Sequence, residues 1–359
     1  MTLLRESTVP SLGHLARVLP PSLLKPFAER FDDMVVKSAA TKLEFPDPLP
    51  DEARKTLQWP IRKGGFGLAS VAMTSPAAYW SAVAQALPSI SACVPLPSVA
   101  GLSGFAPIPP MFRHLFACHK TLASLGCPTG ENGILPTRPE MFCEWYAEGA
   151  EPRLQHAITA SLDDHVFHAR LQHFATPLHD RIRIISCAGR NAGAWLRARP
   201  SCKQLTLPNS DFRIAARLRA GLPPLPRLPS SCKCGEEVAG IYDDHFLACK
   251  KLCPTALRHR HDNVVRLMAD LFRKAGAPVR IEPRPIDGKK DAPDVEVILP
   301  GERLLFDVVI PHPASRSRNS TVPLHAAHVA ENRKEVKYEI LAKKLGAKLL
   351  GFGVEAYVQ

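Results

Sequence analysis

The chain has 359 residues, of which 45% are hydrophobic and 22% charged, and it carries a formal net charge of +12 at pH 7. This length exceeds what one hydrophobic core usually serves, and the composition excludes wholesale disorder, so we expect several folded modules. The 35 prolines predict short elements and many loops rather than long helical bundles.

The N-terminal half of the chain predicts a series of helices. Residues 1–45 predict two or three short helices, one of which has an apolar stripe formed by Leu24, Phe27, Phe31, Met34 and Val35. A proline-rich linker at 46–50 and a turn-rich, glycine-containing element at 59–70 follow. We then expect a buried helix near 77–87, mainly helical structure over 111–220 and a proline-rich connector over 222–231.

Two stretches of low charge could indicate a transmembrane helix or a signal peptide. Residues 64–112 contain no charged residue, but prolines interrupt them and Ala and Ser dominate, so no transmembrane helix is expected. Charges and prolines also break up residues 1–21, so we expect no signal peptide and no secretion.

The pattern changes from residue 256 onward. An amphipathic helix ends at Gly276, and short strands are predicted at 279–283, 293–299 and 303–311. A turn at 300–302 makes the last two strands a hairpin; a helix over about 325–345 and a closing strand follow. The order αβββαβ predicts an α+β fold, a small mixed sheet with helices packed on it.

Most of the positive charge lies in one window. Residues 181–234 contain nine Arg and two Lys against one acid, Asp211, which gives a local charge of +10. Such a concentration is typical of a nucleic-acid-binding track, whose phosphate contacts give salt-dependent affinity with little sequence preference. The residues expected to contact phosphates are Arg181, Arg183, Arg190, Arg197, Arg199, Arg213, Arg217 and Arg219.

A cluster of metal-binding residue types follows this window. Four of the ten cysteines lie between residues 232 and 253. A C-x-C-x10-H-x3-C array is formed by Cys232, Cys234, His245 and Cys249. Thiolates and imidazole suit Zn²⁺, and four ligands close a structural tetrahedron that can contribute about 10 kcal/mol to folding. Alternative residues for one of these ligand positions are Cys253, His259 and His261.

A second constellation combines carboxylates and lysines. Asp294 opens one predicted strand and Asp307 lies within the next, inside an apolar run where a carboxylate is costly unless it is paired or binds a cation. Glu282 adds a third carboxylate at the end of the preceding strand. Converging carboxylates are ligands for Mg²⁺ or Mn²⁺, which would polarise a phosphodiester and help generate hydroxide. Either Lys334 or Lys337, at i, i+3 on the following helix, could orient water or stabilise developing charge.

These residues resemble the C-terminal part of non-LTR retrotransposon polyproteins. The segments that carry the resemblance are Cys232-x-Cys234-Gly235, Asp244-His245, Cys249, Arg258-His259, Glu282-Pro283, Pro293-Asp294, Asp307-Val308-Val309 and Lys334-x-x-Lys337-Tyr338. The resemblance implies a Cys-Cys-His-Cys zinc knuckle followed by a restriction-endonuclease-like core of the PD-(D/E)xK superfamily. It implies a Mg²⁺-dependent enzyme that nicks a DNA target in the nucleus, where the nick primes reverse transcription, with element RNA as a possible second partner.

The same resemblance implies roles for individual residues. Asp294 matches the Asp of the PD motif, Asp307 the second acid, and Lys334 the first lysine of the family's K-x-x-K-Y helix. Val309 stands where the general superfamily has lysine, and in the retrotransposon branch this lysine lies in the following helix.

The N-terminal part is similar to the thumb region that follows the reverse-transcriptase palm in these elements, over residues 15–35, 59–70 and 74–82. Phe31-Asp32-Asp33 imitates a polymerase motif, but only 30 residues precede it. We therefore expect a surface acid pair and no polymerase activity, with the palm supplied elsewhere or lost.

Four domains are expected on this basis. They are a thumb-like helical remnant (1–110), a helical, Arg-rich linker region (111–228), a zinc knuckle (229–255) and a restriction-like endonuclease domain (256–359). The alternative function is that of a catalytically inactive, nucleic-acid-binding retrotransposon remnant.

Overall fold

The computed structural model describes the chain except for residues 104–107, 174–175, 201–205, 228–229, 233, 236–244, 248, 250, 252–253, 284–291, 315–319 and 358–359. It forms two compact units. Unit 1 comprises Met1–Thr176 and Leu196–Ala198, and unit 2 comprises Pro177–Trp195 and Arg199–Gln359. The expected domain limits at 110 and 228 are therefore not the limits of the compact units.

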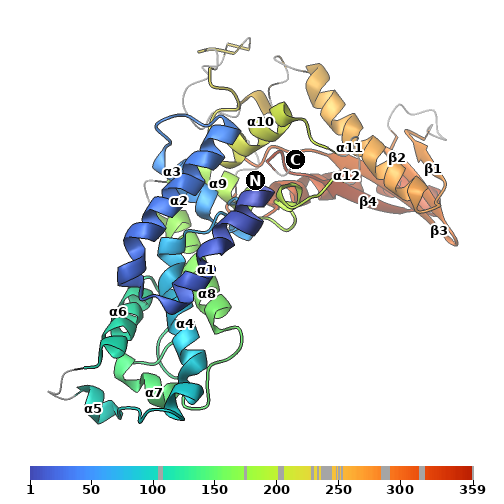
Figure 1. The fold of residues 1–359 in the computed structure, drawn as a ribbon. Coiled ribbons are helices and arrows are strands. Elements are labelled where there is room, and N and C mark those ends of the chain that lie inside the picture. Colours follow the sequence, from blue (N-terminus) through green and yellow to red (C-terminus); the bar gives the residue numbers. More distant parts are fainter. Residues whose placement is uncertain are drawn as a thin grey trace. The chain divides into compact units, whose positions relative to one another are not determined.

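Unit 1 is helical, as predicted (Figure 1). Its elements are η1 (Leu4–Thr8), η2 (Val9–Leu12), α1 (Gly13–Val18), α2 (Pro21–Leu43), α3 (Asp51–Gln58), η3 (Ile61–Lys63), α4 (Val71–Ser91), α5 (Val99–Ser103), α6 (Pro110–Ser124), η4 (Pro139–Met141), α7 (Phe142–Trp145) and α8 (Leu154–Gln172). A further short helix, η5 (Ala194–Leu196), includes Leu196 of this unit. None of the helices in the described ranges is long and apolar enough to cross a membrane.

One core joins α4 to α6, α7 and α8. Trp80 of α4 is fully buried, and its indole N–H donates a hydrogen bond to the Tyr146 hydroxyl at 3.1 Å. Phe142 packs edge-on against Trp80 with ring centroids 4.7 Å apart, and Leu115 and Ile158 belong to the same cluster. Because this core includes residues on both sides of position 110, the first part of the expected linker region is an integral part of unit 1.

Helix α2 buries a different face from the predicted one. Leu24 and Val35 are buried as expected, but Phe27 and Met34 are 68% and 61% exposed. Small residues such as Ala28 take the inner positions instead. The apolar spacing thus predicted the helix correctly and its orientation only in part.

Asp32 is buried, so the prediction that it belongs to a surface acid pair is wrong. Its carboxylate accepts hydrogen bonds from the backbone N–H groups of Val71 at 2.9 Å and Ala72 at 3.1 Å, and from the Ser70 hydroxyl at 2.6 Å. These contacts satisfy free donors at the N-terminus of α4 and place a negative charge at the positive end of its dipole. Asp32 therefore has a structural role, and Asp33 alone is exposed.

Unit 2 contains helices around a four-stranded sheet (Figure 1). Its elements are α9 (Leu178–Cys187), α10 (Asn209–Arg219), η7 (His245–Leu247), α11 (Pro254–Lys274), β1 (Val279–Ile281), β2 (Val295–Leu299), β3 (Glu302–Val309), α12 (His325–Lys344) and β4 (Lys348–Gly353). The sheet order is β1-β2-β3-β4, with antiparallel pairing up to β3 and β4 parallel to β3. The predicted element order and the α+β class are confirmed at this level.

Both faces of β3 are covered, which explains its nearly continuous apolar sequence. Phe306 and Val308 pack in one core with Val265 of α11. On β4, Gly351 and Gly353 let the backbone of α12 approach closely: a Cβ added at either position would lie 3.0 Å or less from α12 backbone atoms. This close approach positions α12 beside the strand that carries Asp307.

Candidate functional site

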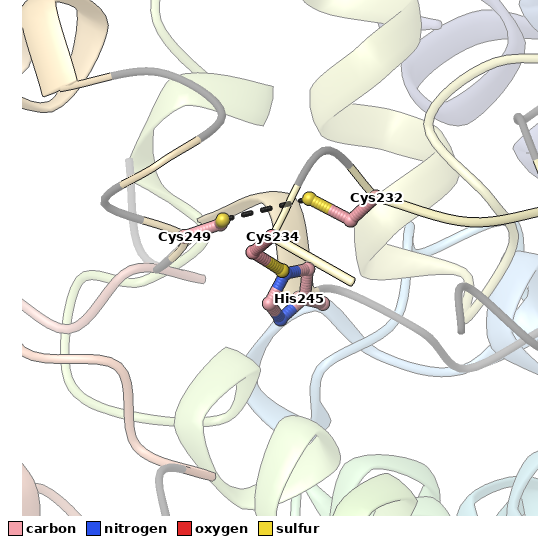
Figure 2. Close-up of side chains that lie close together, drawn as sticks. All are labelled: Cys232, Cys234, His245 and Cys249. Atoms are coloured by element: carbon pink, nitrogen blue, oxygen red, sulfur yellow. Dashed lines mark hydrogen bonds between the residues drawn. The ribbon is translucent and has the colours of Figure 1, made fainter. Parts of the chain in front are cut away.

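The cysteine–histidine cluster consists of Cys232, Cys234, His245 and Cys249. One ligand atom from each residue lies within 4.8 Å of all the others. The sulfur atoms of Cys232 and Cys249 are 3.6 Å apart, and Cys234 Sγ is 3.1 Å from His245 Nε2 (Figure 2). Three thiols and an imidazole around a common centre can hold a metal ion, as the spacing predicts.

A tight turn brings the first two ligands of this cluster together. The Gly235 N–H donates to the Cys232 carbonyl at 2.9 Å, and Gly235 has a φ of 92°, which glycine adopts without strain. Of the alternative ligands, Cys253 lies outside the described residues, and His259 is exposed on α11 and is not part of the four-residue group. Asp244, in the motif next to His245, also lies outside the described residues. His261 contacts a carboxylate of the second site, described below, so it does not replace a member of the cluster.

The second site, here called the carboxylate site, consists of Asp294, Asp307 and Lys334. Strand β2 pairs with β3 so that Val295 lies opposite Phe306. Asp294 directly precedes Val295, and Asp307 directly follows Phe306, so the two acids flank one paired position of these strands. Asp307 is only 2% exposed. Burial raises the pKa of Asp307, Lys334 opposes this rise, and the negative charge of Asp294 adds to it.

The structure distinguishes the two candidate lysines. Lys334 Nζ lies 2.5 Å from Asp307 Oδ2, so the first lysine of the motif contacts the buried carboxylate. Lys337 instead places its ammonium over the ring of Tyr338, 4.8 Å from the centroid. The Tyr338 hydroxyl donates to the Ala292 carbonyl at 3.2 Å, which ties α12 to the segment just before Asp294.

His261 on α11 also belongs to the carboxylate site, although its sequence position made it an alternative ligand for the zinc cluster. Asp294 Oδ2 accepts a hydrogen bond from the Val308 N–H at 2.6 Å and lies 3.2 Å from His261 Nε2. The same Nε2 is 3.1 Å from the Val308 carbonyl. The hydrogen bond to Asp294 is the main cause that raises the pKa of His261 to about 9. His261 is therefore a cation at neutral pH and holds Asp294 against the end of β3.

Two further acids near this site have other roles. Glu282 is exposed with a φ of 45°, and its backbone N–H donates to the Asp294 carbonyl at 2.8 Å. The Glu282 backbone thus helps to fix the position of the Asp294 backbone. Its carboxylate remains a predicted ligand for a divalent cation. Glu296 is buried on β2 and forms an ion pair with Arg303 at 2.7 Å. This pairing gives Glu296 a structural role.

Three of the arginines expected to contact phosphates are buried, so for them the prediction is wrong. Arg183 pairs with Asp180, and both side chains are almost completely buried. Arg217 and Arg219 are 5% and 2% exposed and donate to backbone carbonyls 2.6 Å and 3.4 Å away. The side chains that remain accessible are the exposed Arg190, Arg197 and Arg199 and the half-buried Arg181 and Arg213.

The accessible arginines do not form a single track within one unit. Arg197 belongs to unit 1, whereas Arg190 and Arg199 belong to unit 2. No protein-family model matches the chain, and a comparison with curated proteins finds no match.

Proposed function

We propose that unit 2 carries a Mg²⁺- or Mn²⁺-dependent DNA endonuclease centre of the PD-(D/E)xK type, in a protein related to the C-terminal part of non-LTR retrotransposon polyproteins. The observation that carries this proposal is Asp307, buried beside Asp294 with the Lys334 ammonium 2.5 Å away. A buried acid whose pKa is raised by its burial reduces stability when ionised. Acids with perturbed pKa values cluster at functional sites, which supports a chemical role for Asp307.

Each residue of the carboxylate site has a distinct task in this proposal. Asp294 and Asp307 would hold the divalent cation, which would supply Lewis acidity and lower the pKa of an attacking water. Lys334 donates to the phosphate oxygens as negative charge develops on them. His261 and the Val308 N–H fix the orientation of the Asp294 carboxylate.

The cysteine–histidine cluster has a structural role in the same proposal. Its three sulfurs and one nitrogen match the donor set of a closed Zn²⁺ site, in which each coordination position is taken by protein. Exposed Arg190 and Arg199 would contact phosphates of a DNA target or an element RNA, which fits a protein that acts in the nucleus. These contacts contribute affinity and leave target choice to other features.

The alternative is a nucleic-acid-binding remnant without catalysis. One observation favours it: Asp294 Oδ2 already accepts a hydrogen bond from the Val308 N–H and contacts His261. Asp294 could in that case serve only to close the end of the sheet.

A plasmid-nicking assay separates the two functions. Supercoiled DNA is incubated with Mg²⁺ or Mn²⁺ and wild type, Asp307→Asn or Glu296→Gln, the last removing a buried charge from the same strand pair. We expect the Asp307 variant to lose about 100-fold or more of the nicking rate and the Glu296 variant to retain activity. Equal nicking by wild type and Asp307→Asn would refute the endonuclease proposal, and DNA binding without nicking by wild type would support the alternative.

A further inference from the structure

Unit 1 contains a cavity of about 520 Å³, within the size range of small-molecule sites. Its lining comes from the end of α3, the segment that follows it, the start of α4 and the middle of α8. The walls are largely apolar and aromatic, and include Trp59, Ile61, Leu162, Val166 and Phe167. The cavity lies entirely in unit 1, so it is separate from the carboxylate site of unit 2.

The polar part of this lining is strongly basic. Five of its residues are Lys or Arg, and Asp163 is its one acid. Three of these cations pair with carboxylates, the first being Lys55 with Glu52 at 3.1 Å. Arg62 pairs with Asp163 at 3.1 Å, and Lys63 pairs with Asp164 at 2.5 Å. The two cations of the lining that remain are Arg5 and Arg197.

Arg5 is the more buried of these two cations, since Arg197 is exposed. The Arg5 side chain is 12% exposed; its Nη2 donates to the Leu196 carbonyl at 3.0 Å, and Glu6 lies 3.8 Å away. Its Nη1 is buried and has no hydrogen-bond partner within the described ranges. Burial lowers the pKa of Arg5, Glu6 opposes this effect, and the nearby Arg197 lowers the pKa further. A buried donor without a partner, next to a second cation, is costly unless an anion occupies the site.

We propose that this cavity binds a small aromatic anion, with the ring system against Trp59 and Phe167 and the anionic group at Arg5 and Arg197. The apolar walls gain from covering a flat ring, and an anion gives Arg5 the missing acceptor. This inference is independent of the proposed nuclease activity. It also gives Arg197 a role other than contact with a nucleic-acid phosphate.

The full chain is titrated with the fluorescent probe 1-anilinonaphthalene-8-sulfonate. We expect saturable binding at one site with a Kd on the order of 10–100 µM. The uncharged analogue N-phenyl-1-naphthylamine is expected to bind at least about 10-fold more weakly, because it cannot pair with the arginines. Equal affinity for the two probes, or no saturable binding, would overturn the proposal.

Matched variants locate the binding site. Ala69→Trp fills the mouth of the cavity from an exposed position, and Arg197→Gln removes one of the two cations. We expect the first to abolish probe binding and the second to weaken it about 10-fold. The controls Ala86→Trp and Arg138→Gln change exposed residues of unit 1 outside the cavity and are expected to bind like wild type. Loss of binding in Phe27→Ser would place the probe on α2 instead and contradict the inference.

Discussion

The cysteine–histidine cluster and the carboxylate site lie in the same unit but balance charge differently. In the cluster, four ligand atoms within 4.8 Å of one another offer a closed set of soft donors. In the carboxylate site, each acid has a cationic protein partner, His261 for Asp294 and Lys334 for Asp307. The two sites are both groups of titratable side chains, but their charge balance differs. The cluster needs a cation to balance its thiolates, whereas the acids of the carboxylate site already have cationic partners in the protein.

This difference fits a structural role for the cluster and the catalytic role proposed for the carboxylate site. Three thiols and an imidazole have little to gain from one another without a cation, so a metal ion is expected to hold their segment in place. Around the carboxylate site, α11 packs on β2 and β3 through an apolar core, and α12 approaches β4 closely at Gly351 and Gly353. We therefore expect the fold around the carboxylate site to persist with or without a divalent cation.

The largest expected effect is the loss of stability when the cysteine–histidine cluster loses its metal ion. Cys249→Ser, or strong chelation, removes a stabilisation on the order of 10 kcal/mol from the segment around Cys232–Cys249. We expect loss of about one equivalent of Zn²⁺ and faster amide exchange in this segment, while β3 stays protected. Metal analysis and hydrogen exchange measure both. Cys93→Ser, at an exposed cysteine, is the control, and unchanged metal content in Cys249→Ser would show that the cluster is no metal site.

The next largest effect is a difference in nicking rate between variants of the two lysines of α12. Lys334→Met should reduce nicking about 100-fold, because the amine beside Asp307 is lost. Lys337→Met should change nicking only about 2-fold or less, because its ammonium lies over Tyr338. The ratio of single-turnover rates is the readout. If Lys337→Met proves the more damaging change, the assignment of Lys334 is wrong.

A smaller effect concerns the pH dependence of stability through His261. Its pKa is raised to about 9 in the folded state, against about 6.5 when unfolded, so its stabilisation is fully present below pH 6.5 and is lost as the pH rises through about 9. Allowing for its 32% exposed side chain, we expect a loss of about 2 kcal/mol. Urea denaturation at the two pH values, without added divalent metal, measures it. His261→Gln should show a smaller loss, and an unchanged loss would contradict the ion pair with Asp294.

The smallest effect is on the stability of Asp307→Asn. Burial raises the pKa of Asp307 despite Lys334, so the ionised acid is a net cost to folding above its folded pKa. We expect the free energy of unfolding of this variant to lie within about 1 kcal/mol of wild type at neutral pH. A much larger destabilisation, seen in urea titrations, would assign Asp307 to the fold rather than to chemistry.

Local patterns were sufficient to predict much of unit 2. Alternation over 293–299, an apolar run over 303–311 and Gly301, whose φ is 79°, specify the hairpin of β2 and β3. This hairpin brings Asp294, just before β2, near Asp307 of β3. The ligand spacing of the cysteine–histidine cluster was also local enough to recognise. In these cases neighbouring residues determine the geometry.

Contacts that depend on tertiary packing could not be predicted in this way. His261 reaches Asp294 only because α11 packs on the sheet, and its position on the helix gives no sign of that partner. Arg217 and Arg219 carry charges that predict exposure, yet backbone carbonyls within the fold accept their hydrogen bonds. Asp32 was assigned to the surface for the same reason, because its partners lie about 40 residues away on α4.

The central claim is that Asp294 and Asp307 together bind a catalytic divalent cation. Anomalous diffraction from crystals soaked in Mn²⁺, at a concentration that supports nicking, tests it most directly. We predict one Mn²⁺ within coordination distance of an oxygen from each carboxylate, and no such peak in Asp307→Asn. No Mn²⁺ between these two carboxylates in active wild-type crystals would contradict the claim.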